Sequence, residues 1–290
     1  MADGELGAQI ASYDLGTGRP QRVMVGLVNG THGLVGFGNV QVDFAFVDDG
    51  AKAIDNAQVS VSATASYRLV AGQAVPTQKG PRPISPSEGL GVYTAEAPFD
   101  RAGVWLAEVH VSLNGQARSA QAVFDVRTEP VFPFPGDAAP RTQNRLIGNR
   151  NVPASAIDSR ASEDVAAPDP KLHAVTIASA ITKRRAVMVV VSAPTFCQSR
   201  FCGPITESVE RLAERYSDRM DFVHLEVWNN FAAGAVNRDA AEWIVRSGHD
   251  PQEPWVFGIG TDATITRRFD NIATDQELAD AVTSTLKDNK

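Results

Sequence analysis

The sequence predicts two domains of different fold class: an N-terminal all-β antiparallel sandwich followed by a C-terminal α/β domain. The chain has 290 residues, which exceeds the usual ~100–200 residues of one domain. Apolar residues at 43% and charged residues at 21% are typical of a globular protein. The spacing of apolar residues also changes along the chain, from period two to a mixture of β-rich runs and helical spacing.

The predicted sandwich covers residues 21–127 and follows an N-terminal extension of residues 1–20. Short apolar segments with period two are separated by Gly, Asn and Asp, and no helical run interrupts them. Six or seven such strands are typical of an antiparallel β-sandwich. The segments are residues 23–27, 40–46, 59–63, 92–93, 104–111 and 123–124.

Residues 128–170 are rich in proline and show no periodicity, which predicts a long, semi-extended linker lying across a domain surface. Residues 131–134, with the sequence Val-Phe-Pro-Phe, are too apolar for a free linker. We therefore expect this patch to pack against another part of the chain.

Residues 171–290 predict an α/β domain with the order α-β-α-β-α-β-β-α. A first helix is expected after Asp169 and Pro170, because proline is well tolerated in the first turn. The β-rich run 186–191 is typical of a strand buried on both faces. Helical spacing over residues 205–216 and a capping box at Thr274 and Glu277 mark further helices. The other expected elements are strands at 222–228, 255–259 and 264–269 and a helix at 237–246.

The charge balance excludes several classes of partner. The formal net charge is −7, which argues against binding of nucleic acid or of an anionic membrane through a basic face. The longest apolar run, residues 186–191, is far shorter than the ~20 residues that cross a bilayer. The N-terminus shows neither the basic nor the apolar region of a signal peptide. Two interpretations remain: a cytoplasmic protein, or an ectodomain that has lost its leader or N-terminal anchor.

The two cysteines, Cys197 and Cys202, lie between a predicted strand and a predicted helix. On one regular helix, residues five apart point ~140° away from each other, so a disulfide between them requires a loop. Closing so short a ring stabilises the fold by only ~2 kcal/mol. The position suits a redox-active pair better than a stabilising disulfide, because a helix N-terminus and the nearby Arg200 both lower the pKa of a thiol.

These residues carry a resemblance. A strand followed by Pro194-Thr-Phe-Cys197, then Cys202-Gly203-Pro204 and a helix, with Glu253-Pro254-Trp255 before a late strand, resembles the thioredoxin-like superfamily over residues 171–290. The resemblance implies a central sheet flanked by helices, a solvent-facing Cys197, and a cis peptide before Pro254 that packs against the cysteines.

The resemblance also implies roles for the site residues. Cys197 is expected to be the attacking thiolate and Cys202 the resolving thiol, while Pro254 shapes the cleft. Gly203 and Pro204 are expected to connect the loop to the start of the helix, and the charge of Arg200 is expected to stabilise the thiolate. The spacing departs from the usual C-x2-C of the family, and Val191 stands where many thioredoxins have a buried Asp. A proton acceptor, if one exists, is then Glu226 or Glu253.

Two alternatives remain open for the same residues. Thioredoxin-fold copper proteins use C-x3-C and a distant His, so Cys197, Cys202 and His249 form an alternative copper site. The disulfide would otherwise be structural and fix the loop between Phe196 and Phe201 for protein contact. If the cysteine pair carries out redox exchange, no cofactor is expected.

The N-terminal domain resembles YtkA-like and immunoglobulin-like extracytoplasmic modules through Gly91-Val-Tyr93 and Gly103-Val-Trp105. Such a module and a long linker favour an extracytoplasmic location, periplasmic or at the cell surface. The leading hypothesis is therefore a thiol–disulfide oxidoreductase that exchanges with a protein thiol or disulfide partner.

Overall fold

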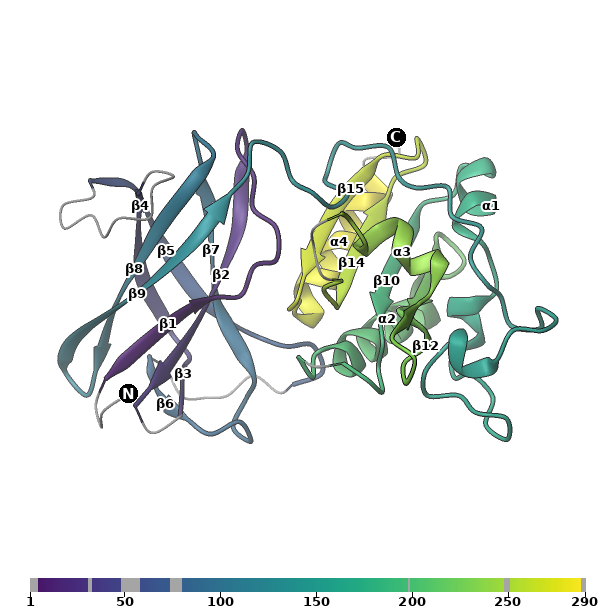
Figure 1. The fold of residues 1–290 in the computed structure, drawn as a ribbon, viewed down its shortest axis with the longest axis horizontal. Coiled ribbons are helices and arrows are strands. Elements are labelled where there is room, and N and C mark those ends of the chain that lie inside the picture. The colour runs from purple at the N-terminus through teal and green to yellow at the C-terminus, as the bar shows by residue number, and fades with distance from the viewer. Residues whose placement is uncertain are drawn as a thin grey trace. The chain divides into compact units, whose positions relative to one another are not determined.

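The computed structural model describes residues 5–30, 33–47, 58–73, 80–197, 199–247 and 251–287. The chain divides into two compact units, Met1–Pro130 and Val131–Lys290. Most strand pairs are antiparallel (Figure 1). Among the described residues, no helix has the length and apolar character needed to cross a membrane.

The first unit is a sandwich-like antiparallel fold in which all strands belong to one hydrogen-bonded sheet. The strand order is β6-β3-β2-β7-β5-β4-β8-β9, and β1 pairs with β2 beside this path. The strands are β1 (Leu6–Ile10), β2 (Pro20–Asn29), β3 (Leu34–Gly36), β4 (Asn39–Phe46), β5 (Val59–Leu69), β6 (Arg82–Ile84), β7 (Gly91–Pro98), β8 (Gly103–Leu113) and β9 (Gln116–Val126).

An aromatic core holds this unit together. Trp105 is fully buried and packs edge-to-face on Phe99, with 4.9 Å between the ring centroids. Phe44 packs in the same manner on Phe99 and on Phe124. Trp105, Phe44 and Phe124 lie in predicted strands, whereas Phe99 follows β7. The period-two pattern indicated the strands but not always the buried face, since Val59 and Val123 of the predicted segments are exposed.

Three strands of the first unit were not indicated by the pattern. β3 and β6 have three residues each, which is too short to show a period. β1 lies inside residues 1–20, the predicted extension, and pairs with β2 from Leu6 opposite Asn29 to Ile10 opposite Val25.

The second unit is built on a four-stranded mixed sheet with the order β11-β10-β14-β15. β10 and β11 are parallel, and the other two pairs are antiparallel. The remaining pieces are two 3-10 turns, four α-helices and a small hairpin. The elements are η1 (Ala154–Ala156), η2 (Pro170–His173), α1 (Ile177–Thr182), β10 (Val187–Ser192), α2 (Cys202–Tyr216), β11 (Asp221–Glu226), β12 (Trp228–Asn230), β13 (Ala235–Val236), α3 (Arg238–Ile244), β14 (Trp255–Ile259), β15 (Ile265–Asp270) and α4 (Asp275–Lys287).

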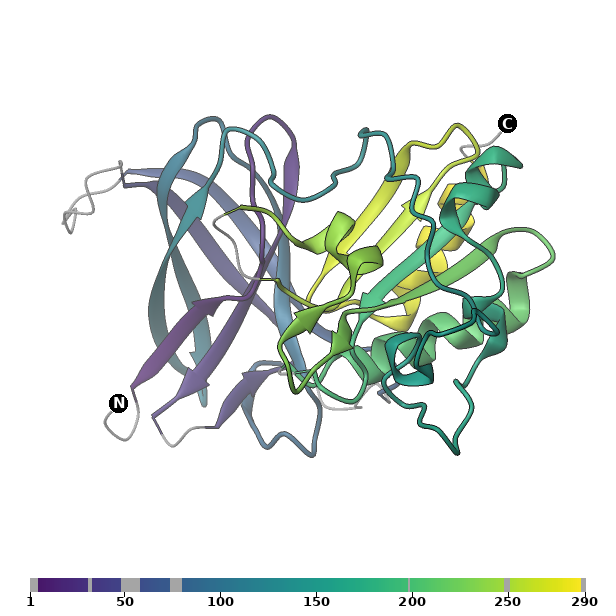
Figure 2. The same cartoon turned by 45° about the vertical axis from the view of Figure 1, so that its right-hand side comes forward.

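Helices cover both faces of this sheet (Figure 2). Phe257 on β14 contacts Trp243 of α3, with 4.9 Å between the ring centroids. A Cβ built on the next residue, Gly258, would lie 2.8 Å from Thr285 Oγ1 of α4. Since neighbouring strand residues point to opposite faces, α3 and α4 lie on opposite sides of the sheet.

Local signals explain where the helices begin. Thr274 and Glu277 exchange the two hydrogen bonds of the predicted capping box at the start of α4. α2 begins at Cys202, ahead of the predicted 205–216, because Pro204 in the first turn needs no N–H partner. The predicted strand 222–228 is divided: β11 ends at Glu226, and Trp228 opens the β12–β13 hairpin.

Residues 131–170, predicted as part of a linker, belong to the second unit. The ring of Phe132 packs on Trp255, with 5.2 Å between the centroids, as expected for this apolar patch. Thr142 accepts a hydrogen bond from Trp243 Nε1 (3.0 Å) and donates one to Glu242 (2.6 Å). Isolated backbone hydrogen bonds, such as that from the Gly136 N–H to the Ile265 carbonyl (2.9 Å), also hold this irregular segment, and such contacts leave no periodicity in the sequence.

Candidate functional site

Cys197 and Cys202 form a disulfide at the N-terminus of α2, with 5.9 Å between their Cα atoms. Cys202 is fully buried as the first residue of the helix, whereas Cys197 is half-buried in the preceding loop. The Cys202 N–H donates to Cys197 Sγ, at 3.4 Å, and the Ser199 hydroxyl lies 3.2 Å from the same sulfur. The Cys197 sulfur therefore faces the positive end of α2.

This position favours a thiolate at Cys197 in the reduced protein. The first turn of α2 lies wholly within the described residues and has no acidic residue and no side-chain cap. Unshared N–H groups at a helix start stabilise a nearby negative charge. Arg200 is exposed and adopts a left-handed φ of 65°, which turns the chain back toward Cys202.

The segment before β14 provides a carboxylate beside the two sulfurs. The Glu253–Pro254 peptide bond is cis, which confirms that expectation. A carboxylate oxygen of Glu253 and the two cysteine sulfurs lie within 4.8 Å of one another. Burial raises the pKa of Glu253 to about 7, and the charge of Glu226 adds to the rise. Glu253 can therefore take up or release a proton near neutral pH.

Glu226 was the other candidate proton acceptor, and it lies farther into the unit. It is buried at the end of β11 and accepts hydrogen bonds from the backbone N–H of Ser159 (2.7 Å) and Trp228 (3.2 Å). Burial raises the pKa of Glu226 as well. The charge of Glu226 thus helps to raise the pKa of Glu253, and Glu253 is the carboxylate that lies beside the cysteine sulfurs.

The other predicted site residues have structural positions around the disulfide. Gly203 and Pro204 form the first turn of α2 after Cys202. Pro254 is buried, and its carbonyl accepts a hydrogen bond from the Asn271 N–H at 2.9 Å. His249, the alternative copper ligand, lies outside the described residues.

Three aromatic side chains, here called the aromatic rim, lie next to the disulfide loop. Phe196, adjacent to Cys197, stacks on Phe231 with 4.3 Å between centroids and 2° between ring planes. Trp228 packs edge-on against Phe231, whose side chain is 43% exposed. The sequence singled out Phe196 and Phe201 but not Phe231, because nothing in the pattern indicated the β12–β13 hairpin.

A second polar group lies buried in the same unit and was not indicated by the sequence. Asp158, His173 and His224, here called the His–Asp cluster, come from three separate segments and are all buried. Asp158 Oδ2 lies 3.5 Å from His173 Nε2 and 3.4 Å from His224 Nδ1. Arg160 donates to both carboxylate oxygens, and His224 Nε2 lies 3.1 Å from the Ser192 carbonyl oxygen.

The charges in the His–Asp cluster follow from these contacts. Burial opposes a charge on Asp158, but the contacts with His173, His224 and Arg160 outweigh it and hold its pKa below the usual range. Burial lowers the pKa of His173. Burial also opposes a charge on His224, yet the Asp158 carboxylate raises the pKa of that ring.

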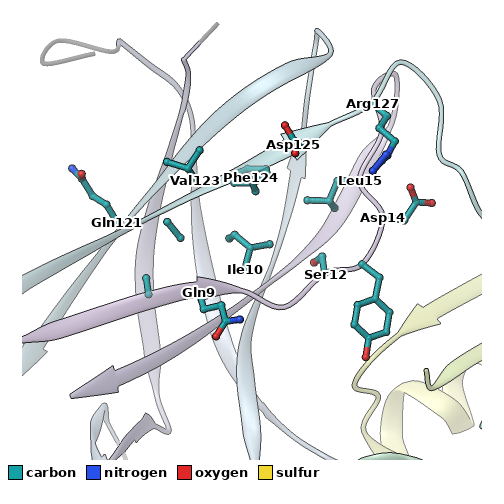
Figure 3. Close-up of a pocket in the computed structure, with 13 residues that line it drawn as sticks. Gln9, Ile10, Ser12, Asp14, Leu15, Gln121, Val123, Phe124, Asp125 and Arg127 are labelled. Carbon is teal, nitrogen blue, oxygen red and sulfur yellow. The ribbon is translucent and has the colours of Figure 1, made fainter. Parts of the chain in front are cut away.

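A groove of about 590 Å³ lies between β1 and β9 of the first unit (Figure 3). β1 pairs with β2 and β9 pairs with β8, so these strand edges come close without sharing a ladder. Gln9 and Ile10 line the groove from β1, and Gln121 and Val123 line it from β9. Its described lining includes Ser12, Asp14 and Asp125 but neither cysteine nor histidine.

No family model matches the chain, and searches of curated proteins and of solved structures found no match either.

Proposed function

We propose that residues 171–290 form a thioredoxin-like domain that exchanges disulfides with a protein partner through Cys197 and Cys202. One observation carries the proposal: the disulfide lies at a helix N-terminus with the Glu253 carboxylate, from the segment of the cis proline, within 4.8 Å of both sulfurs. A structural disulfide needs neither the helix end nor a titratable carboxylate beside it.

The fold of the second unit supports the proposal. The cysteines follow β10, the helix α2 leads into the parallel strand β11, and the cis proline precedes β14. The thioredoxin-like resemblance implies this order of elements around a central sheet. It also implies a solvent-facing Cys197, which agrees with the partial exposure of that residue, while Cys202 is buried.

In the proposed reaction, the reduced Cys197 thiolate attacks one sulfur of a partner disulfide, and the other partner sulfur leaves as a thiolate. A mixed disulfide between Cys197 and the partner results. The Cys202 thiol then gives its proton to the Glu253 carboxylate and attacks Cys197 Sγ. The partner leaves as a second thiolate, so the partner is reduced by two electrons and the Cys197–Cys202 bond forms again.

The aromatic rim supplies the contact surface for such a partner. Phe231 is exposed and is held in place by its stacking on Phe196, next to the attacking sulfur. Exposed aromatic side chains bury much apolar area at a low entropic cost, which suits the docking of an extended or unfolded polypeptide.

The proposed location is extracytoplasmic, periplasmic or at the cell surface. Stable disulfides persist in oxidising compartments, so a protein that exchanges with them finds substrates there. The sandwich-like first unit suits the same location, as such modules are common outside the cytoplasm.

Trapping of the mixed disulfide tests the function. Cys202→Ser removes the resolving thiol, so the reduced variant should accumulate a covalent adduct with a model protein that carries scrambled disulfides. Cys197→Ser is the matched control and should trap nothing, since its remaining thiol is buried. Equal trapping by both variants, or by neither, would contradict exchange through Cys197. Stoichiometric copper that is lost in Cys197→Ser would instead support the copper alternative.

A further inference from the structure

We propose that the His–Asp cluster is a binding site for Zn²⁺ or a similar divalent transition-metal ion, which fastens residues 158–173 to β11. The site is separate from the disulfide and does not depend on the proposed exchange activity. Its ligands are Asp158 Oδ2, His173 Nε2 and His224 Nδ1. Two imidazoles and a carboxylate are a ligand set that zinc accepts readily.

The distances fit such an ion. Zinc bonds to His nitrogen and carboxylate oxygen are ~2.0–2.2 Å long, so the ligand atoms of a tetrahedral site lie about 3.3–3.6 Å apart. Asp158 Oδ2 is 3.5 Å from His173 Nε2 and 3.4 Å from His224 Nδ1. All three ligand atoms lie within 4.8 Å of one another.

Hydrogen bonding leaves a place for a cation between His224 and Asp158. The Ser192 carbonyl can only accept, so His224 Nε2, at 3.1 Å, carries the hydrogen. In the neutral ring, Nδ1 then presents a lone pair to the Asp158 carboxylate. Two acceptors that face each other in a buried site need a proton or a metal ion between them.

His173 supplies the independent observation that favours a metal over a proton. Its side chain is buried, and neither ring nitrogen has a hydrogen bond of normal geometry to a described residue; Asp158 Oδ2 lies 3.5 Å from Nε2, at the limit of hydrogen bonding. A buried polar atom without a partner costs free energy. Coordination of a metal ion by His173 Nε2 removes this cost for one ring nitrogen. A proton shared by Asp158 and His224 would give the His173 ring no new partner, so the cost would remain.

The Asp158 carboxylate can bind a metal ion in addition to its hydrogen bonds from Arg160. Arg160 donates from Nε to Asp158 Oδ1 (3.0 Å) and from a terminal nitrogen to Oδ2 (2.7 Å), so one lone pair of Oδ2 remains for a metal. Glu210 and Asp169 lie 2.6 Å and 3.7 Å from the same guanidinium and balance its charge.

The position also explains what the ion would do. Ser159 follows the ligand Asp158 and makes two hydrogen bonds to Thr195, through its hydroxyl (3.1 Å) and its carbonyl (2.9 Å). Thr195 belongs to the loop that carries Cys197. An ion in the cluster would therefore fix the irregular segment that supports the disulfide loop.

The test uses the full chain in its oxidised form, because the disulfide then removes both thiolates as ligands. The protein is freed of metal with a chelator and titrated with Zn²⁺ in competition with a chromophoric chelator. We expect one ion per chain and a higher midpoint of thermal unfolding. His173→Ala should weaken binding by at least about 100-fold, since loss of an outer-shell partner alone costs 10–100-fold. His110→Ala is the matched control, as His110 pairs with Asp43 in the first unit, and it should bind as the wild type does.

Co²⁺ provides a second readout that needs no variant. A tetrahedral site of nitrogen and oxygen ligands gives strong visible absorption without a sulfur-to-metal charge-transfer band. Absence of binding to the oxidised wild type, binding that survives His173→Ala, or a weak octahedral spectrum would each overturn the proposal.

Discussion

The carboxylate of Glu253 lies within 4.8 Å of the Sγ atom of Cys202, the fully buried sulfur of the disulfide. Glu253 comes from the segment before β14 and Cys202 opens α2, so the fold brings an acid and a buried thiol together from separate elements. The pKa of Glu253, raised to about 7 chiefly by burial, allows this carboxylate to accept a proton near neutral pH.

The rate at which Cys202 resolves the mixed disulfide should follow the ionisation of Glu253. Above a pH of about 7 the carboxylate is charged and can take the Cys202 proton, so the rate should rise through this pH. Stopped-flow measurement of resolution, with a quenched fluorescent mixed disulfide on Cys197, gives the pH profile. In Glu253→Gln the rise near pH 7 should vanish and the rate at pH 8 should fall by ~10²–10⁴, the usual share of a proton-transfer group. An unchanged profile in Glu253→Gln would assign the proton to another group.

The same carboxylate should make stability depend on pH. Its pKa rises from 4.5 to about 7 on folding, so between these values the folded state holds more protons than the unfolded state. The contribution of Glu253 to stability is therefore lost as pH rises through this window. Glu253→Gln stays neutral, so its free energy of unfolding relative to the wild type should increase from pH 4.5 to 7, by at most about 3 kcal/mol. Urea unfolding of both oxidised proteins measures this difference, and a constant difference would contradict the assignment.

Phe231→Ala should weaken exchange with protein substrates but not with small disulfides. The ring is 43% exposed and stacks on Phe196 beside Cys197, so its loss removes contact area for a polypeptide. We expect KM for a protein disulfide to rise roughly tenfold, equivalent to about 1.4 kcal/mol, while the rate with oxidised glutathione changes little. Val123→Ala is the control, because Val123 is 63% exposed on β9 of the first unit. Equal effects on both substrates would show that Phe231 acts on the chemistry or on folding.

Thr142→Val should destabilise the second unit, although Thr142 lies in the segment that the sequence predicted to be a linker. The substitution keeps the shape but leaves Trp243 Nε1 and the Glu242 carboxylate without the threonine hydroxyl. Loss of a buried hydrogen-bond partner costs about 1–3 kcal/mol. Thr283→Val, on the exposed face of α4, removes a similar hydroxyl that bonds Ala279 and should cost less than about 0.5 kcal/mol. Chemical denaturation, monitored by tryptophan fluorescence, measures the free energy of unfolding of the wild type and of both variants. If Thr142→Val lost no more stability than Thr283→Val, residues 131–170 would lie outside the folded unit.

Local patterns in the sequence predicted the elements that depend on short-range chemistry. Thr274 and Glu277 stand three residues apart, so the capping box of α4 was visible in the chain. Trp105 and Phe44 lie in segments with period-two spacing, and both belong to the core of the first unit. Residues 131–170 follow no such rule, because isolated side-chain and backbone contacts join them to distant partners.

The candidate site divides in the same way. The cysteines and the cis Glu253–Pro254 bond were predicted from short motifs. The distance between Glu253 and the sulfurs depends on how β14 lies beside β10, and the sequence left the choice between Glu226 and Glu253 open. Asp158, His173 and His224 have no characteristic spacing, so only the fold brings them together.

The most direct test of the account is the reduction potential of the Cys197–Cys202 pair in the metal-free protein. Free thiols are counted after equilibration with a series of glutathione or dithiothreitol buffers. A disulfide at a helix start with an accessible Cys197 predicts a potential between about −120 and −270 mV, the range of exchange proteins. A potential below about −300 mV, or a bond that resists reduction in the folded protein, would mark a structural disulfide and contradict the proposed function.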